Sequence, residues 1–447
     1  MMFNKEELIR ATKAKILKDN TNKDLQLKIS TDTRTIHSGD IYLPLKGKSF
    51  DGEEFIQNAL EAGAKAYFTT KDQIFDNAEL ILKVEDTLSA YLNIAKFYRE
   101  KINPITVAIT GSAGKTTTKE ILYSVLSQKF KTHKTFSNHN NEIGFCQTVL
   151  NMDKETETLI VEMGMRGLGE IKLIWDHLEP DYAIITNCGS AHIGRLGSLD
   201  NIAKAKCEII SGLKPDGIFI AREQNRIKNN INFHGKKIYY SMKDVTILNK
   251  SKGFSKFKYK NNTYELNVEG DYNIENSLAA IELGTILGMS PEQIRQGLSS
   301  YRPIEKRWEE VNIKGLKFIN DSYNANPESV KASVKTFVEL YENPVVVLGN
   351  MGELGVDEIK YHKEVGQYLA NLNKKVKYLT VGNLAKEIGK ELVAKGFEVK
   401  NFESNKEVSC YILENLNNSY TIFLKASRSM EFEEILENIK RGICKLW

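Results

Sequence analysis

The residue pattern with the most specific chemistry is the run Thr110-Gly111-Ser112-Ala113-Gly114-Lys115-Thr116-Thr117. It stands between an apolar run and a segment with helical periodicity, which predicts a strand, a glycine-rich loop and a helix in that order. Backbone N–H groups of such a loop converge on phosphate oxygens at the positive end of the helix. Lys115 is then expected to neutralise nucleotide β and γ phosphates, and the Thr116 hydroxyl to bind Mg2+. The spacing is that of a shortened phosphate-binding loop, and an ordinary strand-to-helix turn is the alternative.

Three further side chains are candidates for the same site. Glu162 ends an apolar run, where a carboxylate can serve as a metal ligand. His192 follows the strand expected to end at Thr186, at the carboxyl edge where doubly wound sheets bind ligands. A solvated glutamate and a structural histidine are the alternatives. For Lys206, on an expected helix, composition alone favours an exposed lysine.

Amide side chains gather in two later segments. Asn273 and Asn276 share one face of an expected helix and can offer paired donors and acceptors to a flat base such as adenine, although helix capping is an alternative for Asn273. The run Asn320-Asp321-Ser322-Tyr323-Asn324-Ala325-Asn326-Pro327 follows an expected strand. Turn chemistry explains part of this run but not the presence of Asp321 and Tyr323.

The elements that must position these residues follow a β-then-α alternation, which predicts an α/β fold of three domains. Residues 1–103 form a small α/β N-terminal domain, residues 104–305 a central P-loop domain with a doubly wound, mostly parallel sheet, and residues 306–447 a C-terminal Rossmann-like domain. Residues 244–269 are expected to form an antiparallel ribbon inserted in the central domain. The apolar runs expected as strands are 41–43, 66–68, 105–109, 158–161, 182–185, 217–220, 316–319, 344–348, 376–381 and 420–424.

Composition excludes several classes of protein. Lys and Arg number 62 against 58 Asp and Glu, so a net charge of +4 over 447 residues gives no basic footprint, and nucleic acid is not the expected partner. Five cysteines without a Cys-x-x-Cys pair argue against a disulfide framework or a zinc site, and favour reduced thiols in the cytoplasm. A charged N-terminus and the lack of any stretch of about 18 apolar residues predict neither a signal peptide nor a membrane span.

Taken together, the motifs resemble the Mur ligase family, ATP-dependent amide-forming enzymes of peptidoglycan precursor synthesis. The resemblance spans nearly the whole chain. The run Tyr323 to Pro327 is the most diagnostic, because members that add one amino acid carry a different sequence there. The segments that carry the resemblance are Asp32-Thr33-Arg34 with Gly47-Lys48-Ser49-Phe50-Asp51-Gly52, Asn140-Asn141-Glu142-Ile143-Gly144, Asp321 to Pro327, and Lys425-Ala426-Ser427-Arg428-Ser429.

The resemblance implies a role for each candidate residue. Catalytic roles are implied for Lys115, His192 and Lys206. The implied ATP-binding residues are Gly111, Ser112, Ala113, Gly114, Lys115, Thr116, Thr117, Asn273, Asn276, Arg307 and Asp321. The implied ligands of two Mg2+ ions are Thr116, Glu162, His192 and Lys206, the last matching a family lysine that is often carbamylated. The implied substrate-binding residues are Ser30, Asp32, Arg34, Asp51, Asn140, Tyr323, Asn324 and Arg428, the first four at the uridine diphosphate end.

The activity implied by the resemblance is addition of D-alanyl-D-alanine to UDP-N-acetylmuramoyl-tripeptide through an acyl phosphate, by a monomer. The alternatives are a sister ligase that adds a single amino acid, folylpolyglutamate synthase, and an NTPase or kinase without an amine acceptor. The chain departs from the family at His139, where Phe is usual, at Gly194, where Glu is common, and at Asn350, where Asp is usual. These departures concern metal and substrate positioning and leave the phosphate-binding loop intact.

Overall fold

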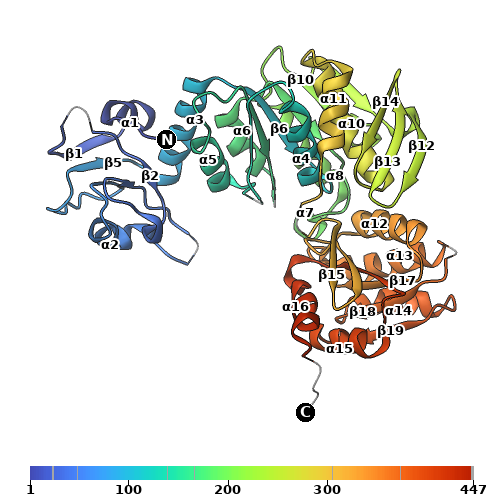
Figure 1. Ribbon diagram of the computed structural model, residues 1–447. Coiled ribbons are helices and arrows are strands. Elements are labelled where there is room, and N and C mark those ends of the chain that lie inside the picture. Colours follow the sequence, from blue (N-terminus) through green and yellow to red (C-terminus); the bar gives the residue numbers. More distant parts are fainter. Residues whose placement is uncertain are drawn as a thin grey trace. The chain divides into compact units, whose positions relative to one another are not determined.

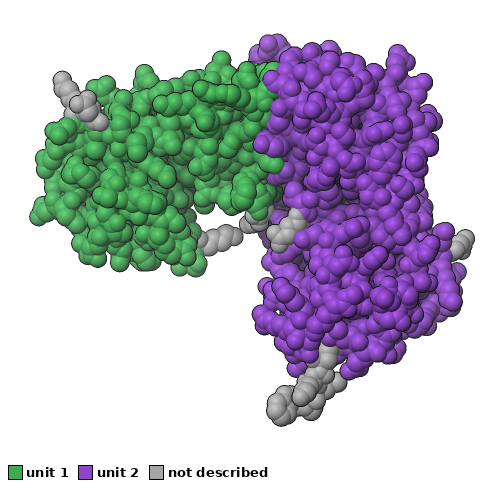
Figure 2. Space-filling view, viewed as in Figure 1, with its two compact units in different colours: residues 1–107, 130–163, 172–181 green, residues 108–129, 164–171, 182–447 purple. Residues whose placement is uncertain are grey.

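The computed structural model describes residues 1–22, 25–47, 49–137, 139–165, 167–304, 306–372 and 374–443 (Figure 1). Lys48, Asn138 and Cys444 lie outside the described residues. Contacts group the chain into two compact units (Figure 2). The first unit comprises residues 1–107, 130–163 and 172–181, and the second comprises residues 108–129, 164–171 and 182–447.

The first unit begins with a five-stranded sheet in the order β1-β5-β4-β3-β2. The pair β1 and β5 is antiparallel and the other pairs are parallel. Tyr42, Tyr67 and Ile81 from three of these strands pack on Ile56 and Ala59 of helix α2. Its elements are α1 (Lys5–Thr12), β1 (Lys15–Asp19), β2 (Ile29–Ser30), β3 (Ile41–Tyr42), α2 (Ile56–Glu61), β4 (Ala66–Thr69), β5 (Leu80–Lys83) and α3 (Thr87–Ile102).

The rest of the first unit contains the beginning of β6 and strands β8 and β7, which lie on one side of β6 in a six-stranded sheet. The order is β6-β8-β7, with β7 and β8 parallel. All five residues of β8 are buried, as expected for a central parallel strand. The elements are β6 (Ile105–Thr110), which crosses into the second unit, β7 (Thr132–Lys134), α5 (Glu142–Leu150), β8 (Thr158–Glu162) and α6 (Glu170–Leu178).

In the second unit the end of β6 leads a series β6-β9-β10-β11, in which β9, β10 and β11 are parallel. Helix α4 packs against α10 and α11. The expected ribbon is confirmed as the antiparallel sheet β12-β13-β14. The elements are α4 (Lys115–Leu126), β9 (Tyr182–Ile185), α7 (Ile193–Leu196), α8 (Leu199–Cys207), β10 (Ile218–Arg222), α9 (Asn225–Asn230), β11 (Lys236–Tyr240), β12 (Val245–Ser251), β13 (Phe254–Tyr259), β14 (Asn262–Leu266), α10 (Asp271–Ile286) and α11 (Pro291–Ser300).

The second unit ends with a six-stranded sheet in the order β15-β16-β20-β17-β18-β19 (orange and red in Figure 1). Only β15 is antiparallel to its neighbour. Helices α15 and α16 cover one face, and Phe337 of α12 packs on Phe423 of β20 at the other. The elements are β15 (Glu309–Ile313), β16 (Leu316–Asn320), α12 (Pro327–Leu340), β17 (Pro344–Gly349), α13 (Glu358–Ala370), β18 (Lys377–Val381), α14 (Ala385–Val393), β19 (Val399–Phe402), α15 (Asn405–Asn415), β20 (Thr421–Lys425) and α16 (Glu433–Arg441).

The predicted α/β fold is confirmed, and each apolar run expected as a strand overlaps a strand of the structure. Seven strands of the described chain lie outside these runs and the expected ribbon: β1, β2, β5, β7, β11, β15 and β19. Among them, β15 and β19 are edge strands with two exposed residues each, so their sequences lack a continuous apolar run. Among the described helices, none is long and apolar enough to cross a membrane.

Candidate active site

The glycine-rich loop joins β6 to α4, as its sequence predicts. Gly114 has φ +79° and caps the helix, and a Cβ atom there would lie 2.5 Å from the side-chain oxygen of Asn276. A Cβ atom on Gly111 would collide with the hydroxyl of Thr186. The Nζ of Lys115 donates to the carbonyl of Gly111 at 2.8 Å. Both glycines are therefore required by the close packing of this loop.

Thr186 and Asn187, which immediately follow β9, hold the loop in place. The backbone N–H of Ser112 donates to the Asn187 carbonyl at 3.0 Å. The Asn187 side chain accepts from the N–H of Ala113 at 3.0 Å and donates to its carbonyl at 2.9 Å, while the Thr186 hydroxyl donates to the same carbonyl at 2.6 Å. The sequence analysis did not single out these two residues. Their place directly after an apolar run, at the edge that carries the loop, is the signal that would have found them.

Lys206 is buried in α8, with about 1% of its surface exposed, so the expectation of an exposed lysine was wrong. Burial, and secondarily the ammonium group of Lys115, lowers the pKa of Lys206 to about 7. The helix places Lys206 on its apolar face together with Ile202 and Ala203. Near neutral pH a large fraction of this amine is therefore uncharged, which is the form that reacts as a nucleophile.

Glu162 and Asn140 are brought together in the first unit. Glu162 ends β8 with about 2% of its surface exposed, and its Oε1 accepts from the side-chain amide of Asn140 at 3.1 Å. The alternative of a solvated glutamate is therefore wrong, and the role of Glu162 as a metal ligand stays a prediction. No group of three or more His, Cys, Asp and Glu side chains arranged for a metal occurs among the described residues. The metal ligands that the resemblance implies include Thr116 and Lys206, which are not among these four residue types.

His192 adopts φ +66° at the start of α7, and its Nδ1 forms an ion pair with Oε2 of Glu353 at 2.6 Å. Arg195 lies 3.7 Å from the other oxygen of Glu353. The N–H of Gly194 donates to the Glu353 carbonyl at 2.9 Å, and a side chain at Gly194 would collide with the backbone of Gly355. This close approach is a physical reason for glycine where the family commonly has Glu.

The two asparagines of α10 face different partners. Gly270 caps the helix, and Asn273 instead donates from its amide to the carbonyl of Glu269 at 2.6 Å, so the capping alternative is excluded. Asn276 lies against the glycine-rich loop at Gly114. Both side chains are more than nine-tenths buried. The structure thus places one of the pair directly beside the phosphate-binding loop.

Arg307 links the glycine-rich loop to the diagnostic run that follows β16. Its Nη2 donates to the Thr116 hydroxyl at 2.9 Å, and its guanidinium lies 4.1 Å from the centre of the Tyr323 ring. The amide of Asn326, which caps α12, also donates to the carbonyl of Ser112 at 3.3 Å. Two independent bonds therefore join the end of β6 and start of α4 to the region of Tyr323.

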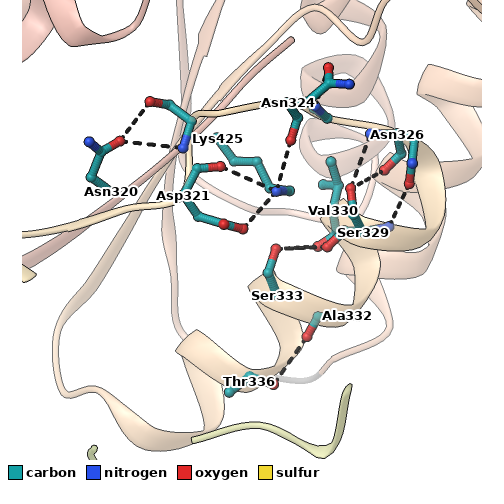
Figure 3. A network of polar contacts seen from close by, with 12 residues as sticks. Asn320, Asp321, Asn324, Asn326, Ser329, Val330, Ala332, Ser333, Thr336 and Lys425 are labelled. Carbon is teal, nitrogen blue, oxygen red and sulfur yellow. Dashed lines mark hydrogen bonds and ion pairs between the residues drawn. The ribbon is translucent and has the colours of Figure 1, made fainter. Parts of the chain in front are cut away.

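Lys425, at the end of β20, holds the run that begins at Asp321 (Figure 3). Its Nζ donates to Oδ2 of Asp321 at 2.6 Å and to the carbonyl of Asn324 at 3.1 Å, while the Asn324 residue is itself exposed. Glu328 on α12 was not predicted, yet its carboxylate accepts from the N–H of Ser190 at 2.9 Å and from its hydroxyl at 2.8 Å. Its signal in the sequence is weak, since a glutamate in the first turn of a helix is common.

The remaining predicted substrate residues lie at turns. Asp32 caps a short 3-10 helix and pairs with Arg34 at 2.7 Å, and the side chain of Arg34 is 87% exposed. Hydrogen bonds from Arg34 hold the pKa of Asp32 at about 2. The Ser30 hydroxyl donates to the Asp32 carbonyl, and Asp51 caps a second 3-10 helix. Arg428 is 53% exposed and pairs with Glu433.

Comparison with known proteins places this geometry in a family. Models for the Mur ligase family catalytic domain, the Mur ligase middle domain and the Mur ligase glutamate ligase domain match residues 28–103, 109–284 and 306–428. The chain is 37% identical over 426 residues to the UDP-N-acetylmuramoyl-tripeptide–D-alanyl-D-alanine ligase of Bacillus subtilis strain 168, with 92% of each chain covered. The chain belongs to the Mur ligase family.

Solved structures of this family share the fold. A crystal structure of MurF from Acinetobacter baumannii has a TM-score of 0.90 and 28% identity, with 99% of each chain covered. A crystal structure of MurF ligase from Thermotoga maritima in complex with ADP has a TM-score of 0.83 and 25% identity, and the match covers 94% of this chain and 99% of that one. The architecture is therefore that of a Mur ligase over essentially the full length.

Proposed function

We propose that this Mur ligase adds D-alanyl-D-alanine to UDP-N-acetylmuramoyl-tripeptide with consumption of ATP, in peptidoglycan precursor synthesis. The observation that carries the proposal is the bond from Asn326 to Ser112. This hydrogen bond holds the run Tyr323 to Pro327 against the phosphate-binding loop. Three relatives that are each named UDP-N-acetylmuramoyl-tripeptide–D-alanyl-D-alanine ligase support the choice of substrates. Phosphoryl transfer followed by amine attack needs the two substrates close together, and contact between the phosphate-binding loop and the run Tyr323 to Pro327 brings their proposed binding sites together.

The reaction begins when the terminal carboxylate of the tripeptide attacks the γ-phosphorus of ATP, which gives an acyl phosphate and ADP. The amine of D-alanyl-D-alanine then attacks the acyl carbon, and phosphate leaves from the tetrahedral intermediate. Lys115 and the N–H groups of the loop stabilise the phosphate charges in both steps. Asn276 and Asp321 are the residues proposed to orient the nucleoside, and Arg307, which donates to the Thr116 hydroxyl at 2.9 Å, is proposed to bind the phosphates.

Two Mg2+ ions, when bound, would screen the charge that otherwise repels the attacking carboxylate. Thr116, Glu162, His192 and a carbamylated Lys206 are the proposed ligands. The buried, readily deprotonated amine of Lys206 fits this role, since only a neutral amine can attack CO2 and the product is a carboxylate-like group. His192 already binds the carboxylate of Glu353, which fixes its ring orientation.

The proposal extends to the rest of the molecule. Residues 1–103 would hold the uridine diphosphate end around Ser30, Asp32, Arg34 and Asp51, residues 104–305 would bind ATP, and residues 306–447 would present the dipeptide to the acyl phosphate through Tyr323, Asn324 and Arg428. We propose that the enzyme acts as a monomer in the cytoplasm. The balanced charge of the chain agrees with small-molecule substrates.

Phosphate release separates this proposal from its alternatives. The purified protein is given ATP, Mg2+ and UDP-N-acetylmuramoyl-tripeptide, with D-alanyl-D-alanine, with a single amino acid, or with no acceptor. We expect sustained release and a product of the expected mass only with the dipeptide. Release with lysine or glutamate as acceptor would favour a sister ligase or a folylpolyglutamate synthase, and release without acceptor an NTPase.

Lys115→Ala tests the role of the loop in the same assay. The change should lower kcat by about a thousandfold, because it removes the cation that stabilises the transferred phosphate. Lys129→Ala, just beyond the end of the same helix, is the matched control, since Lys129 binds the carbonyls of Leu287 and Gly288. Equal rates for Lys115→Ala and the unaltered enzyme would refute the mechanism.

A further inference from the structure

Lys425 has an unusual position for a lysine. It is the last residue of β20, and its side chain is 4% exposed. Its ammonium donates to three oxygens: Oδ2 of Asp321 at 2.6 Å, the carbonyl of Asp321 at 3.2 Å and the carbonyl of Asn324 at 3.1 Å (Figure 3). An ammonium group has three N–H donors, so each has a partner. The hydrogen bonding of this buried charge is complete.

A buried ion pair of this kind is weak evidence for stability, because the cost of removing both charges from water offsets most of their attraction. Apolar side chains of similar volume would stabilise a sheet edge as well. The neighbouring ends of β16 and β17 supply Asn320 and Gly349, and neither brings a charge to this edge. A role in positioning explains the charge better than a role in folding does.

The three bonds of Lys425 reach two parts of the site at once. Asp321 is the residue proposed to contact the nucleotide ribose, and Asn324 belongs to the loop proposed to receive the dipeptide. Two residues beyond Lys425, the hydroxyl of Ser427 donates to the carbonyl of Ala325 and accepts from the N–H of Gly352 at 2.6 Å. The end of β20 therefore fixes the same loop at successive backbone carbonyls.

The far end of that loop is fixed to the nucleotide side. Asn326 caps α12 through the N–H of Ser329 and donates to Ser112 in the phosphate-binding loop. Because one ammonium group donates both to the Asp321 carboxylate and to the Asn324 carbonyl, a displacement of the carboxylate strains the bond to the Asn324 backbone. Nucleotide bound at Asp321 therefore also orders the backbone of Asn324, where the dipeptide is proposed to bind.

We infer that Lys425 is a positioning residue that couples nucleotide binding to acceptor binding by tying Asp321 to the backbone of Asn324. The inference rests on the proposed function and goes beyond it, because it assigns the cooperation between two substrates to a residue that contacts neither. Bound nucleotide should raise the affinity for D-alanyl-D-alanine, and the dipeptide should raise the affinity for nucleotide by the same factor.

Lys425→Met tests the inference, because methionine is an unbranched side chain of similar volume that removes the charge and the donors. We expect the KM values for ATP and for D-alanyl-D-alanine each to rise about tenfold, as for loss of a buried charged hydrogen bond. The KM for UDP-N-acetylmuramoyl-tripeptide should change less than twofold. Calorimetric titration of a non-hydrolysable ATP analogue, with and without dipeptide, should lose the mutual enhancement that the unaltered enzyme gives.

Lys377→Met is the matched control. Lys377 is the first residue of β18, a strand of the same sheet that is separated from β20 by β17, and it pairs with Glu398 at 3.1 Å. It therefore lies at the opposite end of the strands from Lys425. This variant should keep all three KM values and the mutual enhancement. A general loss of folded enzyme would lower kcat and the melting temperature without changing any KM.

The outcomes distinguish the inference from the proposed function. If the unaltered enzyme makes no product with the dipeptide, the proposed function fails. If it makes product but Lys425→Met changes only kcat or keeps the mutual enhancement, Lys425 has no positioning role. Should Lys425→Met not fold, Lys425→Gln, which removes the charge, is judged by the same KM values and titrations, and unchanged values in that folded variant overturn the inference.

Discussion

At the scale of single residues, Lys206 shows how burial changes the chemistry of an amine. Its pKa of about 7 makes it mostly neutral above pH 7 and protonated below it. In enzyme kept with 13C-labelled bicarbonate, the carbamate signal should therefore grow as the pH rises from 6 to 8. Lys206→Gln should abolish the signal, whereas Lys204→Gln, which removes an exposed lysine of the same helix, should keep it. A signal that survives Lys206→Gln would place the carbamate elsewhere.

Arg428 is proposed to bind the terminal carboxylate of the dipeptide, through charge and its planar guanidinium. Its half-exposed side chain pairs with Glu433, a partner that an incoming carboxylate can replace. Arg428→Ala should raise the KM for D-alanyl-D-alanine about tenfold while the KM for ATP stays constant. Arg441→Ala, which removes another exposed arginine paired with a glutamate, is the control. An unchanged KM for the dipeptide in steady-state assays would reject this role.

At the scale of elements, the loop between β6 and α4 depends on close packing as well as on backbone conformation. Gly114→Ala adds a methyl group 2.5 Å from the Asn276 side chain at φ +79°, whereas Gly253→Ala adds one at φ +69° with nothing within 4 Å. Both changes strain the backbone, so their difference isolates the crowding. Chemical denaturation should give Gly114→Ala an additional loss of about 1 kcal/mol or more, and calorimetry a loss of nucleotide binding. An equal loss of stability in Gly114→Ala and Gly253→Ala would show that the Asn276 side chain can move away without cost, which would contradict the prediction.

The elements themselves were largely predictable. Strand β6 and helix α4 follow from a continuous apolar run and a 3.6-residue period, which are properties of neighbouring residues. The edge strands β15 and β19 were missed because each has two exposed residues, which interrupt the apolar pattern. The burial of Lys206 was missed for a different reason. It depends on which face of α8 packs inward, and composition carries no information about that.

At the scale of the whole molecule, individual polar contacts join the region after Lys306 to the earlier part of the second unit, which holds the phosphate-binding loop. They include Arg307 with Thr116, Asn326 with Ser112, Glu328 with Ser190 and Glu353 with His192. Individual polar contacts of this kind can break and form again while the region after Lys306 moves as a rigid body. We expect the C-terminal domain to rotate when ATP and the tripeptide bind, with a change on the order of 5 Å in the distance between spin labels at Asn261 and Lys395. Unchanged distances and X-ray scattering profiles with both ligands would contradict this motion.

The features that depend on neighbouring residues could be predicted from the sequence: the α/β alternation, the phosphate-binding loop and the run from Asp321 to Pro327. Tertiary structure alone decided which of these parts meet. Thr186 and Asn187 brace the loop, Glu328 reaches Ser190, and Lys425 joins Asp321 to Asn324. The two partners of each pair are 73 to 138 residues apart in the sequence. Lys425 meets Asp321 because the parallel strands β20 and β16 end at one edge of their sheet. Glu328 and Ser190, by contrast, follow strands of two different sheets and meet only because these sheets pack within the second unit.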